Sequence, residues 1–172
     1  MKKNIDNINL DHYKLVIFDI DGTLYNQKKL RKRMLLSLIS YYLFKPHRLF
    51  QLNIIRKFRI EREKRKGTVC DQLETEQYQW VSALTSFPVG KIRDVIDEWM
   101  FQRPLRYLPP TAFSHVSELF SRLREKKIRL AVYSDYPTKD KMNALNLSVD
   151  LEVASTDPEI NALKPAPNGL AY

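Results

Sequence analysis

The sequence is poor in cysteine and histidine. Cys70 is the only cysteine among 172 residues, so the chain cannot form an internal disulfide, and a reducing compartment is the simpler expectation. The three histidines, His12, His47 and His115, are far apart and lack the spacing of metal ligands. Any metal chemistry must therefore come from other residue types.

Long apolar segments are also missing. The longest nearly apolar run, residues 34–44, is interrupted by Ser37 and Ser40 and is too short to span a bilayer. Residues 1–7 are partly basic but contain no apolar stretch long enough for a signal peptide. These features predict a cytoplasmic protein. A chain of 172 residues that is 44% hydrophobic can bury one main core plus a small accessory domain.

The segment Lys14–Tyr25 has the most informative pattern. Its residues Leu15–Phe18 are apolar without alternation, which predicts a strand of a parallel sheet that is buried on both faces. The pair Gly22–Thr23 breaks the strand, so Asp19 and Asp21 lie just past its carboxyl end. Ligands bind at that edge in open α/β sheets, and two close carboxylates there can hold a divalent cation or divide nucleophile and acid roles.

Three segments resemble, in order, the motifs of one family. Residues 19–25, DIDGTLY, resemble the first motif of the haloacid dehalogenase superfamily, D-x-D-G-T-[LV]. Residues 128–135, IRLAVYSD, resemble the second motif, a strand that ends in Ser or Thr. Residues 164–170, KPAPNGL, resemble the third motif, a lysine followed by proline. The resemblance implies an α/β fold with a Rossmann-like parallel sheet as its core.

The resemblance also implies a function, the Mg²⁺-dependent hydrolysis of a phosphate monoester. Asp19 would attack phosphorus and form an aspartyl-phosphate, while Asp21 would protonate the leaving alcohol and then deprotonate the attacking water. The metal ion would be held by Asp19 and by the main-chain carbonyl of Asp21. The residues expected to hold or orient the phosphate are Gly22, Thr23, Ser134, Asp135 and Lys164.

The aspartate at position 21 narrows the function further. Superfamily members that cleave carbon–halogen bonds or phosphonates generally lack an aspartate two residues after the nucleophile. The resemblance therefore implies a phosphatase that acts on a small phosphorylated substrate. A phosphomutase, which transfers the phosphoryl group within a sugar phosphate, is one alternative.

The fourth motif of the superfamily has no counterpart here. It normally supplies a further metal carboxylate, but no acidic residue follows Lys164. Asp157 and Glu159 precede this lysine and have the pattern of ordinary turn acids beside Pro158. We therefore expect either a chain shortened at its C-terminus or a protein completed by something outside these residues. In both cases the 15–18 strand of this chain should have an open edge, which favours association, including self-association. The alternative function is a non-catalytic relative that binds a phosphorylated ligand or an anionic surface.

Helical periodicity extends over the segment after the first motif. Predicted helices cover about 30–44, 48–66, 72–85 and 89–103, and Pro46 should end the first. One apolar stripe is expected on that first helix, formed by Leu30, Met34, Leu35, Leu38, Ile39, Tyr42 and Leu43. The position of these helices resembles the helical cap of the family, although extra core helices would show the same periodicity.

The predicted domains are therefore discontinuous. Residues 1–25 and 108–172 should form the Rossmann-like core, and residues 26–107 the all-helical cap. Within the second core segment we expect a helix around 113–123, a strand at 128–133, a helix near 139–145 and a strand near 151–154.

Positive charge is concentrated in the predicted cap. The net charge of the chain is +9, yet residues 26–66 hold 14 Lys and Arg against Glu61 and Glu63 only. A solvated helix face is the simplest interpretation of any single cluster. Two clusters, at 28–33 and 56–66, suggest a partner as well. Steering of a polyanionic substrate ranks slightly ahead of an anionic membrane surface, and nucleic acid ranks third.

Overall fold

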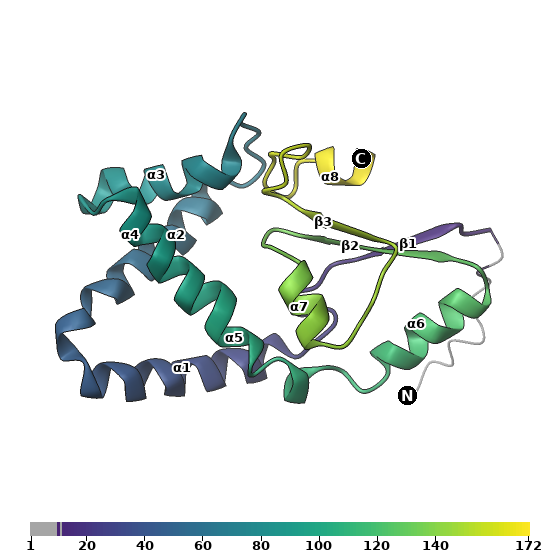
Figure 1. Cartoon of the computed structure of the whole chain (residues 1–172). Helices are drawn as coiled ribbons and strands as arrows, with labels where there is room; N and C mark the ends of the chain where they lie inside the picture. Colours follow the sequence, from purple (N-terminus) through teal and green to yellow (C-terminus); the bar gives the residue numbers. More distant parts are fainter. Residues whose placement is uncertain (1–9, 11) are drawn as a thin grey trace.

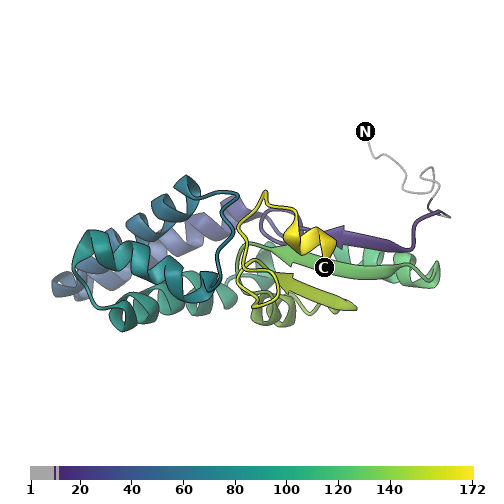
Figure 2. The same cartoon turned by 90° about the horizontal axis from the view of Figure 1, so that it is seen from above.

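The protein has a three-stranded parallel sheet at one end and a group of helices at the other (Figures 1 and 2). The computed structural model describes residue 10 and residues 12–172, so the basic N-terminal residues and the start of the predicted 1–25 segment lie outside the described residues. The strands β1 (Leu15–Phe18), β2 (Arg129–Ser134) and β3 (Leu151–Ala154) lie in the order β1-β2-β3. This architecture confirms the predicted α/β class.

Helices cover the two faces of the sheet unequally. On one face, α6 (Val116–Glu125) and α7 (Lys139–Ala144) contribute Phe120, Leu123 and Met142 to a buried cluster with Leu130 and Val132 of β2. On the other face, the short α8 (Asn168–Ala171) and the loop before it cover the end of β2 and β3 (Figure 1). The buried cluster there comprises Tyr133, Val153, Ile160, Ala162 and Ala166.

The prediction that β1 is buried on both faces is wrong. Val16 and Phe18 pack into the cluster under α6, but Leu15 and Ile17 on the opposite face are 37% and 40% exposed. The physical reason is that α8 and its loop cover only the carboxyl-terminal part of β2 and β3. Within the described residues β1 pairs only with β2, so its outer edge is open, as predicted.

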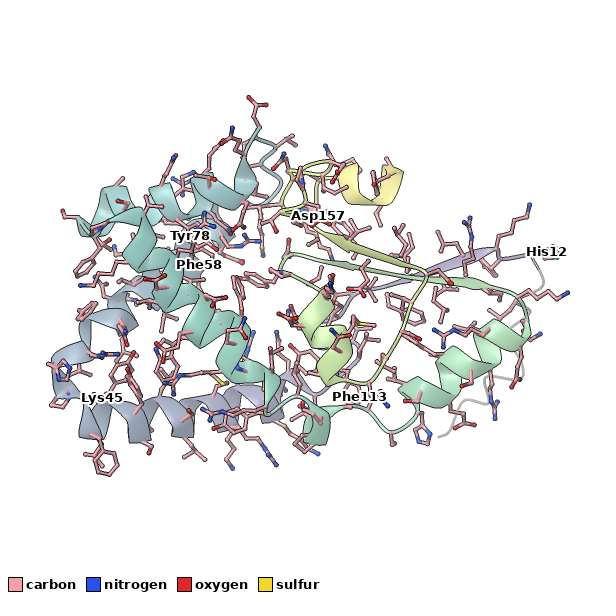
Figure 3. All side chains as sticks on the ribbon, in the orientation of Figure 1. His12, Lys45, Phe58, Tyr78, Phe113 and Asp157 are labelled. Carbon is pink, nitrogen blue, oxygen red and sulfur yellow. The ribbon has the colours of Figure 1, made fainter. Side chains whose placement is uncertain are left out.

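The helical unit follows β1 and has its own core. It consists of α1 (Gln27–Phe44), α2 (Phe50–Lys64), α3 (Leu73–Thr85) and α4 (Val89–Ile96), the last continued by the π-helical turn η3 (Asp97–Gln102) and α5 (Arg103–Leu105). The short 3₁₀ turn η2 (Pro46–Arg48) lies between α1 and α2, and η4 (Pro109–Thr111) follows α5 where the chain returns to the sheet unit. Phe58 of α2 stacks on Tyr78 of α3, with ring centroids 5.7 Å apart (Figure 3). The four predicted helices are thus present.

The single apolar stripe predicted for α1 is only partly correct. Leu30 and Tyr42 are buried, and Met34 and Leu38 are half-buried against the rest of the protein. Three members of the predicted stripe, Leu35, Ile39 and Leu43, are exposed. The reason is that α1 carries apolar side chains around most of its circumference, whereas its neighbours cover one side. In the described part of the chain, no helix is both long enough and apolar enough to cross a membrane.

Two short bridges lie where the helical unit meets the sheet unit. Tyr25 pairs with Ala112, so the two chain segments that enter and leave the helices are joined at the base of the helical unit. Val69, in the loop between α2 and α3, pairs with Ala162 in the loop that follows β3. Within the latter contact the Gly67 amide donates to the Lys164 carbonyl at 3.2 Å. The loop of the third motif is therefore held by the helical unit as well as by the sheet.

Candidate active site

The carboxyl ends of the three strands meet at one edge of the sheet, because all three run parallel. Asp19 follows β1, Ser134 ends β2, and the loop after β3 leads to Lys164. The Lys164 ammonium donates to Asp19 Oδ1 at 2.9 Å and to the main-chain oxygen of Tyr133 at 2.6 Å. Residues separated by 145 positions in the chain thus form one ion pair at this edge.

A tight turn shapes the segment around Asp19. The carbonyl of Ile20 accepts hydrogen bonds from the Thr23 and Leu24 amides at 3.2 and 3.1 Å. Gly22 has φ +97°, a backbone conformation that a residue with a Cβ rarely adopts. The turn brings the Thr23 hydroxyl within 3.3 Å of Asp19 Oδ2, to which it donates. Both oxygens of Asp19 therefore have a polar partner on the protein.

Asp21 is bound to two residues that sequence motifs did not indicate as partners. The Lys141 ammonium of α7 donates to both of its oxygens, at 2.8 and 2.7 Å. The Tyr25 hydroxyl donates to Oδ1. Burial, followed by the negative charge of Asp21, raises the pKa of Tyr25 well above its ordinary value, so this phenol stays a proton donor at neutral pH.

Ser134 and Asp135 lie next to each other but have different surroundings. Ser134 is fully buried, and its hydroxyl accepts a hydrogen bond from the Tyr136 amide at 3.2 Å. Asp135 Oδ1 accepts from the Ser155 hydroxyl at 3.1 Å and from the Lys164 amide at 3.2 Å. The Asp135 carboxylate thus positions the main chain of the lysine that contacts Asp19.

A buried arginine connects the helical unit to this edge. Arg62 of α2 is only 5% exposed and donates to the main-chain oxygen of Asp135 and to the Gln77 side chain. Its guanidinium lies 4.6 Å from the centroid of the Tyr136 ring, within range of a cation–π interaction. The loop that follows β2 is therefore held from the helical side by a charged group with little access to water.

A cavity of about 470 Å³ lies between the helical unit and Asp21. Its polar wall includes Asp21, Lys141, Arg31, Arg59 and Glu63. Most of the remaining lining is apolar and comes from α1, η3 and α5, including Met34, Leu38, Trp99, Met100, Phe101 and Leu105. A cavity of this size and lining suits a small organic ligand with one charged end.

The described residues supply only part of a ligand set for a magnesium ion, but the oxygen ligands that are present suit this ion. In the described residues no three His, Cys, Asp or Glu side chains come together at a point where they could hold a metal. Mg²⁺ usually keeps several waters and binds one or two carboxylates together with substrate phosphates. The Asp19 carboxylate and the Asp21 carbonyl fit such a site. Asp157, in the loop after β3 (Figure 3), already accepts the Ala154 amide at 2.7 Å and caps its own turn.

Some of the predicted site residues contact one another directly, and others are linked through the main chain of a third residue. Asp19, Thr23 and Lys164 are in direct contact, whereas Asp135 reaches the group through the lysine main chain. Lys141 and Arg62 were missed because they lie in helices whose sequences carry no motif. A basic residue in the first turn of the helix after the second motif is a signal that could have indicated Lys141.

Comparison with known proteins assigns the family. No curated protein matches the chain closely. The family profile for haloacid dehalogenase-like hydrolases matches residues 13–172, which include β1, the helical unit, the other two strands and all three motifs. Since the match covers nearly the whole chain, the protein belongs to the haloacid dehalogenase-like hydrolases.

Proposed function

We propose that the protein hydrolyses phosphate monoesters with Asp19 as the nucleophile. The observation that carries the proposal is the contact of 2.9 Å between Lys164 Nζ and Asp19 Oδ1 at the carboxyl edge of the sheet. An ammonium beside a carboxylate can hold a phosphoryl oxygen close to the attacking oxygen and offset the charge that develops in the transition state. In this proposal the helical unit, residues 26–107, acts as a cap.

The reaction takes place in two steps at Asp19. In the first, an Asp19 oxygen bonds to phosphorus, the bond from phosphorus to the alcohol oxygen breaks, and protonated Asp21 gives its proton to the alcohol. In the second, Asp21 takes a proton from water, which bonds to phosphorus while the bond to Asp19 breaks and phosphate leaves. Asp19 and the Asp21 carbonyl would hold Mg²⁺, which neutralises phosphoryl charge when bound.

The proposed role of Asp21 requires a rearrangement. Lys141 and Tyr25 hold both of its oxygens, so Asp21 must release at least one of these bonds before it can serve a substrate. The apolar lining of the cavity beside Asp21 supports a leaving group with an apolar body. We therefore expect a larger kcat/KM for hexyl phosphate than for glycerol phosphate, two alkyl esters that differ mainly in the apolar character of the leaving group.

Trapping of the covalent intermediate tests the proposal. The chain is incubated with Mg²⁺ and ³²P-labelled acetyl phosphate, quenched in acid and assayed for bound label. Asp19→Asn should abolish labelling, and the exposed acid Asp94 of α4 provides a matched control, because Asp94→Asn should leave labelling unchanged. Undiminished hydrolysis of p-nitrophenyl phosphate by Asp19→Asn would contradict the mechanism.

A second candidate is a non-catalytic phosphate-binding protein. It is favoured by the engagement of Asp21 with Lys141 and Tyr25 and by the incomplete set of metal ligands among the described residues. Calorimetry with inorganic phosphate distinguishes the two. Binding of phosphate that is lost in Lys164→Met, without turnover of any ester, would support this second candidate over the first.

A further inference from the structure

The outward face of α1 carries apolar side chains in its second half. Leu36, Ile39, Leu43 and Phe44 are 60%, 58%, 74% and 80% exposed, respectively. Leu49, just after η2, is also exposed. Single exposed apolar residues are common on protein surfaces, but several neighbouring ones on a single helix usually mark a contact surface.

The first half of the same outward face is basic. Lys28, Lys29, Lys32 and Arg33 are all exposed. At 100° per residue, Lys29 and Lys32 lie opposite the buried side that contains Leu30 and Tyr42, and Lys28 and Arg33 lie on either side of them, nearer to its borders. No acidic residue occurs between Asp21 and Glu61. Positive and apolar side chains thus share one face of one helix, with no negative charge on that helix.

A groove of about 610 Å³ continues this face towards α5. Four cationic side chains line it, namely those of Arg33, Lys45, Arg103 and Arg106. The exposed side chains of Leu36 and Phe44 form its apolar border with α1. Lys45 stands at the end of α1, at the corner of the helical unit (Figure 3). None of the residues that line the groove is acidic.

We propose that this face of α1, with the adjoining groove, binds the surface of an anionic phospholipid membrane. Interfacial helices combine Lys and Arg, which attract lipid phosphates, with Leu and Phe, which enter the boundary between headgroups and acyl chains. Here the basic half supplies the attraction, the groove takes headgroup phosphates, and Leu43 and Phe44 insert. The inference does not depend on the proposed phosphatase activity.

The arrangement favours a membrane over steering of a soluble substrate. Of the five basic residues in 28–33, only Arg31 lines the cavity beside Asp21. Arg33 lines the groove instead. A charge cluster that only steers substrate would not need exposed leucine and phenylalanine beside it, whereas an interfacial helix does.

Vesicle co-sedimentation tests the proposal with the complete chain. Vesicles of phosphatidylcholine alone are compared with vesicles containing about 30% phosphatidylglycerol, because basic segments bind more tightly to membranes that contain anionic lipid. We expect binding only to the anionic vesicles, and weaker binding as salt increases. Replacing Lys28, Lys29, Lys32 and Arg33 by Glu should lower the partition coefficient by about 100-fold or more, because each basic residue near the surface contributes several-fold.

A second variant probes insertion, and a third is the control. Leu36→Ser, Leu43→Ser and Phe44→Ser together should weaken binding by about tenfold or more while the salt dependence remains, since only apolar burial is lost. The control reverses four exposed basic residues elsewhere, Arg56, Lys127, Arg129 and Lys139, and should keep at least half of the wild-type binding. Circular dichroism confirms that each variant is folded.

Three outcomes would overturn the proposal. The first is equal binding of the wild type to neutral and anionic vesicles, or binding to neither. The second is a loss in the control that is as large as the loss in the α1 charge variant. The third is a wild-type dimer in light scattering that the serine variant converts to a monomer, because this face would then contact a second copy of the chain.

Discussion

Lys141 and Asp21 form a two-point ion pair, with the ammonium 2.8 and 2.7 Å from the two carboxylate oxygens. Their side chains are only 12% and 20% exposed. The pair joins α7 to the turn after β1, two segments that are far apart in the sequence. The pair therefore holds Asp21, to which we assign proton transfer, in a fixed position relative to α7.

Removal of one partner from this pair should destabilise the protein. Lys141→Met leaves a largely buried carboxylate without its cation, so we expect a loss of about 2 kcal/mol in the free energy of unfolding. Urea denaturation measures it, with Lys139→Met on the exposed side of α7 as control. In a double-mutant cycle with Asp21→Asn the two losses should not add, with a coupling of about 1 kcal/mol. Additive losses would show that the two side chains do not interact.

Arg62 should be one of the most sensitive cationic residues of the helical unit. Arg62→Met leaves the Asp135 carbonyl and the Gln77 side chain without their donor, and we expect a loss of about 3 kcal/mol in stability. Arg62→Lys should rescue little, because a single ammonium cannot reproduce the planar fork. Arg56 of the same helix is exposed, so Arg56→Met is the control. If Arg62→Met and Arg56→Met caused equally small losses of stability, the contacts assigned to Arg62 would be contradicted.

Gly169 of α8 should tolerate no side chain. A Cβ at this position would lie 2.4 Å from Cζ of Tyr133, so Gly169→Ala should cost about 1–3 kcal/mol by overpacking. Gly90 of α4 has no atom within 4 Å of an added Cβ, and Gly90→Ala should be neutral or stabilising.

Tyr133 offers the complementary test at the same contact. Its hydroxyl is buried and has no hydrogen-bond partner within the described residues. Tyr133→Phe should therefore leave stability unchanged or raise it by up to about 1 kcal/mol. Thermal unfolding of Gly169→Ala, Gly90→Ala and Tyr133→Phe measures these changes in stability. A marked loss of stability in Tyr133→Phe would show that the hydroxyl has a partner.

Alkaline pH should destabilise the protein through its buried tyrosines. Burial raises the pKa of Tyr42 to about 12 and raises the pKa values of Tyr25, Tyr78 and Tyr136 as well. The unfolded chain releases these protons near pH 10 while the folded chain keeps them, so stability is complete below about pH 10 and falls above it. Each group contributes at most about 1.4 kcal/mol per pH unit.

Ultraviolet titration provides the measurement. At pH 11 the folded protein should show fewer ionised tyrosines than the chain in urea, and Tyr42→Phe should reduce the difference by about one group. Identical titration curves for the folded and unfolded chain would contradict the raised pKa values.

The sequence by itself determined the secondary structure and the family, because both depend on local order. The run Leu15–Phe18, the turn at Gly22 and the proline at 46 each act over a few residues, and β1 and the end of α1 lie where these signals predict them. The motif around Asp19 likewise needs only seven consecutive residues. Periodicity therefore predicted the helices and strands, with boundaries that differ by a few residues.

Only the tertiary structure decided which side chains meet and which faces stay uncovered. The pairing of Asp21 with Lys141 and of Arg62 with the Asp135 carbonyl joins residues 120 and 73 positions apart, and no local pattern encodes such contacts. The exposure of Ile17 and Leu43 depends on which elements pack against β1 and α1. An apolar residue shows only that it can be buried, and its burial depends on the neighbours that the folded chain supplies.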